Sequence, residues 1–118
     1  MRSIRDDEPT VVQPVSLVVS LWIRGDDIGA FEAFEQAAAE VMSKYGGRIE
    51  TVIRCSDLEA GPFEVHIVTF PDVMALDAYR QDPRVAELRP LRERVISRTE
   101  IWSGEQRQPY GPGGPDCV

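Results

Sequence analysis

The sequence is poor in the residues that most metal and redox sites require. It contains one histidine, His66, and two cysteines, Cys55 and Cys117. A structural zinc site commonly takes about four Cys or His ligands at close spacing, and this chain does not supply such a set. We therefore predict no metal site. The two thiols fit a reducing compartment better than a disulfide scaffold, so a cytoplasmic protein is expected.

Long hydrophobic segments and an excess of basic residues are also missing. The longest apolar run, around residues 15–23, is too short to span a membrane. Residues 1–14 contain acids and prolines and do not resemble a signal peptide. Lys and Arg number 13 against 20 Asp and Glu, which gives a formal net charge of −7. Nucleic acid and anionic membranes both require a basic face, so neither is an expected partner. The chain also has no dinucleotide fingerprint or phosphate-binding loop, and we predict no cofactor.

What remains is one domain of ordinary globular composition. The chain has 118 residues, of which 42% are hydrophobic and 28% charged, and a domain of this size can bury a core of its own. The sequence divides into a flexible N-terminal arm over residues 1–14, a folded domain over residues 15–104 and a Gly/Pro-rich tail over residues 105–118.

Apolar residues in the folded domain follow two periods. Alternation with period two predicts strands over residues 15–23, 48–55, 63–70 and 95–102. Helices are predicted in the two long gaps. The order strand, helix, strand, strand, helix, strand is that of an α+β ferredoxin-like βαββαβ fold, in which a four-stranded antiparallel sheet carries both helices on one face.

Capping residues mark where the two helices begin and end. Asp26 or Asp27 opens the first helix, and the glycine pair at 46–47 ends it. Pro71 opens the second helix, which breaks at residues 82–83 and restarts. Spacings of three and four residues predict an apolar stripe along the first helix. Its polar side is expected to hold Glu32, Glu35, Gln36, Glu40 and Lys44.

Strand alternation also predicts two different faces for the sheet. The face toward the helices is expected to hold Val15, Leu17, Val19, Leu21, Ile49, Ile53, Phe63, Val65, Ile67, Val95 and Ile101. The opposite face is mixed and is expected to hold Ser16, Val18, Ser20, Trp22, Arg48, Glu50, Val52, Arg54, Glu64, His66, Val68, Phe70, Ile96, Arg98, Glu100 and Trp102. Such a face is too apolar for water and too charged for a sealed core. Packing two copies together would resolve both problems, so we predict a homodimer.

Antiparallel pairing in the strand order fourth, first, third, second predicts rows of neighbours on the mixed face. The rows are Val52–His66–Ser20–Arg98, Arg54–Glu64–Trp22–Ile96 and Glu50–Val68–Val18–Glu100.

Several short motifs resemble a known family. Residues 44–48 read Lys-Tyr-Gly-Gly-Arg, residues 68–72 read Val-Thr-Phe-Pro-Asp, and residues 88–92 read Leu-Arg-Pro-Leu-Arg. As a set they resemble the domain-of-unknown-function-1330 family of the dimeric α+β-barrel superfamily, over about residues 15–104. The resemblance implies a barrel-shaped dimer. The superfamily also holds cofactor-free antibiotic-biosynthesis monooxygenases, polyketide cyclases, muconolactone isomerases and haem-degrading enzymes, so it implies no single reaction.

The candidate catalytic residues lie on the mixed face. His66 is the candidate for proton transfer, because imidazole titrates near neutral pH. Arg98 would hold a carboxylate, enolate or phenolate, as Arg54 also could, and Trp22 would form an aromatic wall. Further candidate binding residues are Ser20, Glu100 and Trp102 on the sheet, and Tyr45 and Tyr79, which would rim a pocket between helices and sheet.

Structural interpretations stand beside these functional ones. Arg54 with Glu64, and Arg98 with Glu100, also fit ion pairs that fix an interface. The tryptophans and tyrosines also fit packing alone. These interpretations allow three functions. The first is a cofactor-free enzyme that acts on a small apolar or aromatic, polyketide-like metabolite by proton transfer, cyclisation, isomerisation or oxygenation. The second is a non-catalytic ligand-binding dimer, and the third is an accessory protein whose tail docks another chain.

Overall fold

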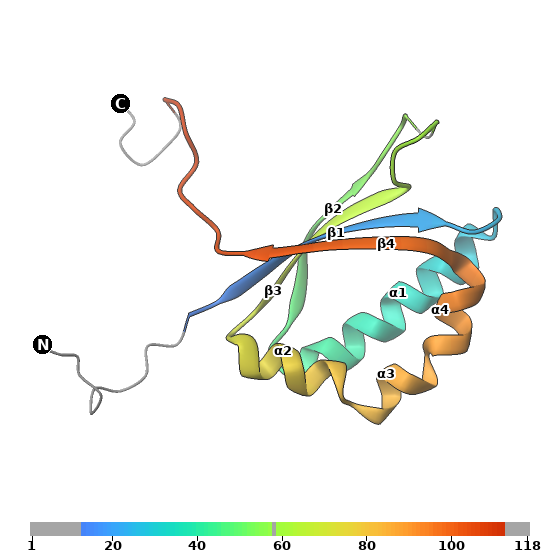
Figure 1. Cartoon of the computed structure of the whole chain (residues 1–118), viewed down its shortest axis with the longest axis horizontal. Coiled ribbons are helices and arrows are strands. Elements are labelled where there is room, and N and C mark those ends of the chain that lie inside the picture. The colour runs from blue at the N-terminus through green and yellow to red at the C-terminus, as the bar shows by residue number, and fades with distance from the viewer. Residues whose placement is uncertain (1–12, 58, 113–118) are drawn as a thin grey trace, which may run out of the picture.

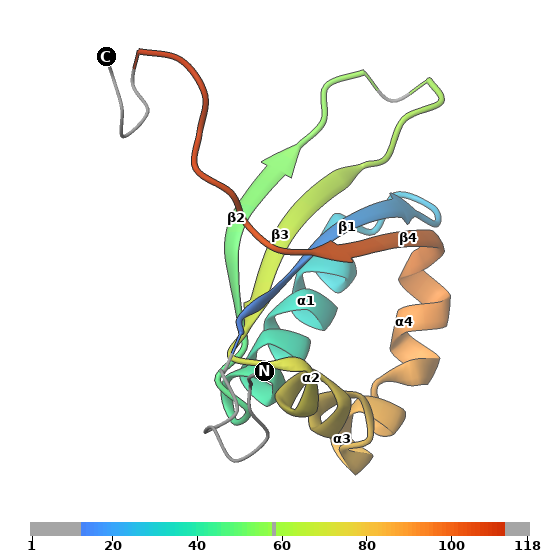
Figure 2. The same cartoon turned by 60° about the vertical axis from the view of Figure 1, so that its left-hand side comes forward.

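Four antiparallel strands form one sheet in the order β2-β3-β1-β4, and the helices lie against one side of it (Figures 1 and 2). The computed structural model describes residues 13–57 and 59–112. Its elements are β1 (Val15–Ile23), α1 (Ile28–Ser43), β2 (Arg48–Arg54), β3 (Glu64–Phe70), α2 (Val73–Arg80), α3 (Pro83–Glu87), α4 (Arg89–Val95) and β4 (Ile96–Gly104). The predicted ferredoxin-like βαββαβ fold is confirmed.

Aspartates set the starts of the helices. The Asp27 side chain accepts a hydrogen bond from Ala30 N at 3.0 Å, and Asp72 caps α2 in the same way. Asp82 caps the short helix α3 by accepting from Arg84 N at 2.7 Å, which explains the predicted break at this point. Caps act locally, which is why these boundaries can be predicted from sequence.

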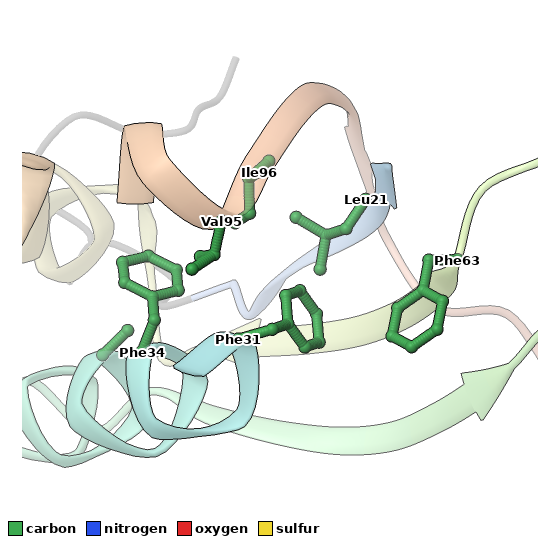
Figure 3. Packing of buried hydrophobic residues seen from close by; sticks show 7 residues of the cluster. Leu21, Phe31, Phe34, Phe63, Val95 and Ile96 are labelled. Atoms are coloured by element: carbon green, nitrogen blue, oxygen red, sulfur yellow. The ribbon is translucent and has the colours of Figure 1, made fainter. Parts of the chain in front are cut away.

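The core consists of two clusters of buried side chains between the helices and the sheet. One is built around Phe31 and Phe63, whose rings meet edge to face at 5.3 Å (Figure 3). Its buried members are Leu21, Phe31, Phe34, Ala38, Phe63, Val95 and Ile96. The second cluster comprises Leu17, Met42, Val68, Phe70 and Leu76. Both clusters therefore hold sheet and helices together.

The register of the sheet agrees with the predicted rows only in part. His66 lies opposite Val52, as predicted, but its partner on β1 is Val19 rather than Ser20. Arg54 lies opposite Glu64, as predicted, whereas Trp22 pairs with Arg98. The other row members are also displaced: Val68 lies opposite Leu17 and Ile49, Glu64 opposite Leu21, Glu100 opposite Ser20, and Ile96 opposite Ile23.

This register reverses the predicted face of β3. Glu64, His66, Val68 and Phe70 point toward the helices and are buried, whereas Val65 and Ile67 point away from them. The physical reason is that Glu64 and His66 bind each other inside the fold, so their polarity did not exclude them from the interior. The other residues assigned to the wrong face are Val52, Arg54 and Ile96, which lie on the helix side, and Ile53, which does not.

We call the uncovered side of the sheet the open face. Pairing places on it Ser16, Val18, Ser20, Trp22, Arg48, Thr51, Ile53, Val65, Ile67, Thr69, Arg98, Glu100 and Trp102. The reversal makes this face less charged than expected, because Arg54, Glu64 and His66 lie on the helix side.

The ends of the chain lie largely outside the described residues. This holds for residues 1–12 of the predicted arm and for residues 113–118 of the predicted tail, with Cys117. Residues 105–112 follow β4 as exposed chain outside helices and strands. Among the described residues, no helix has the length and apolar character needed to cross a membrane.

Candidate functional site

A cavity of about 140 Å³ lies between the sheet and the helices. Most of its wall is apolar and comes from both core clusters, with Leu17 and Val19 of β1 at its base. The polar residues that line it are Glu35, His66, Tyr79, Arg80, Arg92 and Thr99. An apolar hollow with a few convergent polar groups is the usual form of a small-molecule site.

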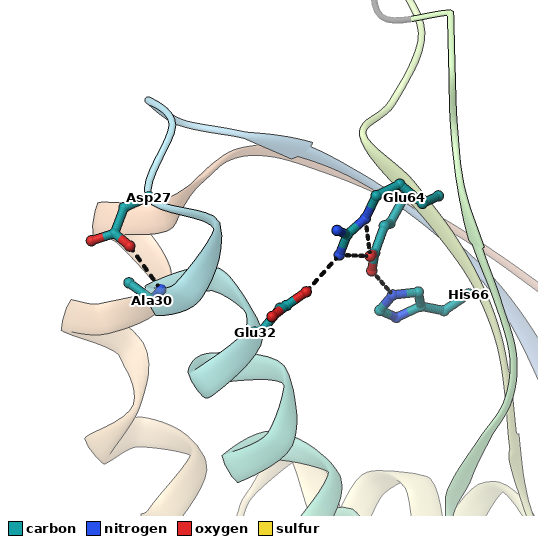
Figure 4. A network of polar contacts seen from close by, with 6 residues as sticks. Asp27, Ala30, Glu32, Glu64 and His66 are labelled. Carbon is teal, nitrogen blue, oxygen red and sulfur yellow. Dashed lines mark hydrogen bonds and ion pairs between the residues drawn. The ribbon is translucent and has the colours of Figure 1, made fainter.

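His66 forms the centre of a polar network on one wall. Its side chain is 4% exposed; its Nε2 lies 2.8 Å from Glu64 Oε1 and its Nδ1 lies 3.6 Å from Glu35 Oε1. Arg54 in turn donates from Nε to Glu64 Oε2 at 2.8 Å and from Nη2 to Glu32 at 3.0 Å (Figure 4). The buried carboxylate of Glu64 is thus balanced by a guanidinium on one side and by the imidazole on the other.

Local periodicity brings Glu35 to His66. On α1, Glu35 follows the buried Phe31 and Phe34 and precedes the buried Ala38, so it falls within the apolar stripe. It was expected on the polar side of the helix, and that expectation is wrong. The sequence feature that could have predicted the burial of Glu35 is a charged residue at a position within an apolar stripe.

The pKa of Glu35 is raised from 4.5 to about 6, chiefly because the carboxyl group is buried. His66 lowers this pKa, Glu64 raises it and Arg92 lowers it, each by less than burial raises it. Burial likewise raises the pKa of Tyr79, with Glu35 acting in the same direction. A carboxyl group whose pKa is near 6 exchanges protons readily close to neutral pH. The cavity therefore has an acid–base group that is adjacent to an imidazole.

The α4–β4 side of the cavity carries a cation. Arg92 of α4 donates from Nη2 to Thr99 Oγ1 of β4 at 2.7 Å, and both residues line the cavity. Sequence reasoning assigned no role to Arg92, Thr99 or the exposed Arg80. Like Glu35, Arg92 lies within an apolar stripe, between Leu88 and Val95.

The Glu35–His66 pair also contacts the outside of the molecule. Both residues line a second, open groove between α1 and the β2–β3 pair, together with Glu64 and Arg54. The same pair thus borders the cavity on one side and a solvent-accessible groove on the other, so protons can reach it without passing through the cavity.

Of the tyrosines predicted to rim a pocket, Tyr79 lies at the cavity and Tyr45 does not. Tyr79 packs on Phe70 with ring centroids 5.4 Å apart. The Tyr45 hydroxyl donates to Asp82 Oδ2 at 2.5 Å, which ties the end of α1 to the start of α3. Hydrogen bonds from Arg84 and Tyr45 hold the pKa of Asp82 well below its usual range.

The other predicted site residues form a separate group on the open face. The Arg98 guanidinium lies 4.4 Å from the Trp22 ring centroid and pairs with Glu100. Trp22 also donates from Nε1 to Ala60 O at 3.3 Å. Ser20 and Trp102 belong to the same face. The sheet separates this group from His66, so the structure does not bring the predicted set together. Both ion pairs considered as a structural alternative, Arg54–Glu64 and Arg98–Glu100, are present.

Within residues 13–57 and 59–112, no group of three or more His, Cys, Asp and Glu side chains is arranged to hold a metal ion.

Comparison with known proteins supports the fold. No family model matches the chain, so the resemblance to the domain-of-unknown-function-1330 family gains no support there, and no curated protein matches its sequence. A protein of unknown function from Rhodopseudomonas palustris, RPA0582, is 15% identical with a TM-score of 0.69, over 84% of this chain and 86% of that one. SnoaB, a cofactor-independent oxygenase from Streptomyces nogalater, is 15% identical with a TM-score of 0.65, over 82% and 96%.

A third structure bears on assembly. A dimeric protein of unknown function with a ferredoxin-like fold from Bacteroides fragilis is 12% identical with a TM-score of 0.54, over 81% of this chain and 100% of that one. At these identities the likeness establishes the ferredoxin-like fold alone.

Proposed function

We propose that this chain is a cofactor-independent enzyme that moves a proton on a small, largely apolar metabolite bound in the cavity between helices and sheet. The observation that carries the proposal is the Glu35–His66 pair, placed in the wall of a mostly apolar hollow. The fold it shares with SnoaB, an oxygenase that needs no cofactor, is consistent with such chemistry.

The chemistry begins with a weakly acidic C–H bond next to a carbonyl group. The pair accepts the proton, and the electron pair of the C–H bond moves onto the carbonyl oxygen to form an enolate. Return of the proton to another carbon isomerises the compound. Alternatively, the enolate carbon attacks a second carbonyl group and closes a ring, and the pair returns the proton to the alkoxide that forms. Glu64 is hydrogen-bonded to the His66 imidazole, and Arg54 in turn holds Glu64. This arrangement fixes the geometry of the imidazole before the ligand binds.

We further propose that a second copy of the chain covers the open face. That face exposes Val18, Ile53 and Trp102, the last with 59% of its surface in water. The likeness to a dimeric ferredoxin-like protein supports a second copy of the chain as the partner. The apolar side chains would be buried, while Arg98 and Glu100 are already paired within one copy.

Hydrogen–deuterium exchange tests the proton transfer without knowledge of the natural substrate. The protein is incubated in D2O with a panel of single-ring ketones, and loss of the α-proton NMR signals is followed. We expect at least one ketone to exchange faster than in buffer. Glu35→Gln and His66→Asn should each slow that exchange by about a hundredfold or more, since general acid–base groups commonly contribute that much.

Glu40→Gln is the matched control, because Glu40 is an exposed glutamate of the same helix. It should leave the exchange rate unchanged. Ketones that shift the NMR signals of cavity residues yet exchange no faster than in buffer would refute the enzyme and leave a ligand-binding protein. Unfolded variants are recognised by circular dichroism, and Glu35→Asp then serves as the second substitution.

A further inference from the structure

Arg92 is a partly buried cation with an incomplete set of partners. It donates one hydrogen bond, to the neutral hydroxyl of Thr99. Among the described residues it forms no ion pair, whereas five of the other arginines, including Arg54, Arg84 and Arg98, do. A guanidinium group has five N–H donors, and charges away from water are normally paired.

The nearest candidate partner does not complete the set. Glu35 is close enough to Arg92 for the cation to lower its pKa, but the two side chains form no ion pair. Burial also favours the neutral form of Glu35. Arg80 adds a second positive charge to the lining of the same cavity. The wall formed by α4 and β4 is therefore suited to an anion supplied from outside.

The size of the cavity limits the rest of the ligand. An apolar cavity of about 150 Å³ in another protein holds a benzene molecule, and the cavity here measures about 140 Å³. A single ring therefore matches the volume of this space. The apolar wall at Leu17, Val19 and Val68 offers the surface against which a ring would pack.

We infer that the ligand of this cavity is a compact monocarboxylate: a single ring, or an apolar body of that size, whose carboxylate is bound by Arg92. A carboxylate suits a guanidinium because two parallel N–H donors can meet its two oxygens. With the carboxylate at Arg92, the body of the ligand lies in the same cavity as Glu35 and His66. The inference rests on the proposed function only in taking this ligand as the substrate.

Binding of simple probe compounds to the full chain tests the inference. Benzoate, benzamide and 2-naphthoate are titrated separately and followed by NMR and calorimetry. Benzoate should bind at least about tenfold more tightly than benzamide, which has the same shape without the charge, because hydrogen bonds to charged groups are the stronger ones. It should also bind more tightly than 2-naphthoate, because one ring matches the volume of about 140 Å³ better than two fused rings do.

Substitution of the arginine supplies the second arm. Arg92→Gln should weaken benzoate binding about tenfold or more and leave benzamide binding nearly unchanged. Arg89→Gln is the matched control, because Arg89 lies on the same helix but is exposed and does not line the cavity. If Arg92→Gln fails to fold, Arg92→Lys replaces it and should retain part of the preference for benzoate over benzamide.

Three results would overturn the inference: equal binding of benzoate and benzamide, unchanged benzoate binding in Arg92→Gln, or no binding of any probe. The proposed function fails separately. Tight benzoate binding without ketone exchange would refute the proposed enzyme activity and support the monocarboxylate ligand. Ketone exchange that saturating benzoate does not inhibit would refute the monocarboxylate ligand and support the proposed enzyme activity.

Discussion

Glu35 is the residue at which burial and charge oppose each other most directly. Its carboxyl group has little contact with water, and its pKa rises from 4.5 to about 6 although a histidine and an arginine lie near it. Burial therefore outweighs the two favourable charges. Folding favours the protonated carboxyl, which makes the stability of the protein depend on pH.

The pH dependence has a definite sign. The stabilising contribution of protonated Glu35 is complete below about pH 4.5 and is lost as the pH rises through about 6. A shift of this size corresponds to about 2 kcal/mol. Between about pH 4 and pH 7.5, the unfolding free energy of the wild type should thus fall by about 2 kcal/mol relative to that of Glu35→Gln. Urea denaturation at a series of pH values measures the difference.

Glu40→Gln should follow the wild type across the same pH range. Parallel curves for the wild type and Glu35→Gln would show that the Glu35 carboxyl has an ordinary pKa in the folded protein, and would remove it as the acid–base group.

Single residues were predicted unevenly from the sequence. His66 was selected because it is the only imidazole, and the structure places it in a cavity wall, although on the other side of the sheet. Glu35 and Arg92 were missed because charged residues were assigned to solvent by type. Their positions within apolar stripes depend on the helices that cover them, and periodicity could have shown this.

At the scale of the elements, the link from α1 to β2 packs closely against the core. Gly46 takes a positive φ of 76° at the end of α1, and Gly47 lies against the fully buried ring of Phe70. A Cβ atom on Gly47 would come within 2.6 Å of Phe70 Cζ and 2.7 Å of Met42 Cγ. Phe70 and Met42 both line the cavity. The absence of a side chain at Gly47 therefore lets the α1–β2 link pack directly against two residues of the cavity wall.

Gly47→Ala should lower the unfolding free energy by about 1–3 kcal/mol, because added volume in a packed core forces side chains out of place. Gly104→Ala is the matched control, since a Cβ there has no neighbour within 4 Å. Denaturant titration of both variants gives the comparison. Equal stability of Gly47→Ala and the wild type would show that Phe70 and Met42 can yield, and that the close approach is not required.

Element boundaries could be predicted well because their causes are local. Asp27 and Asp72 cap helices through side chains that reach only three residues along the chain. The face of β3 could not be predicted in the same way, because either of its alternating sets could pack inward. The choice depends on Arg54 and Glu35, which come from other elements, and on a register shift between Ile49 and Thr51 in β2.

For the molecule as a whole, one side of the sheet is covered and the other is bare. Sequence alternation predicted a mixed face that requires a partner, and the structure places fewer charged residues on it than were expected. Chain length predicted a single domain, and the order of the predicted strands and helices indicated the ferredoxin-like fold and with it the strand order. The identity of the partner depends on a surface that only the folded sheet creates.

Trp102→Glu tests whether a second copy covers the open face. The wild type should sediment as a dimer, and the variant should shift toward the monomer, because a charge would be buried against the apolar partner. Met74→Glu is the matched control: Met74 is 79% exposed but lies on α2, away from the open face. It should leave the dimer intact. A wild-type monomer, or a Trp102→Glu dimer as tight as that of the wild type, would contradict the proposal.

The reversed face of β3 has a further consequence for how this protein can change. Along this strand the even-numbered positions, such as Glu64 and His66, meet the cavity side, and the odd-numbered positions, such as Val65 and Ile67, meet the open face. The proposed chemistry and the proposed assembly thus depend on alternate residues of one strand. Substitutions at even positions would change the ligand specificity of the cavity, while unchanged odd positions would keep the surface for association. The two properties could therefore change separately in descendants or in designed variants.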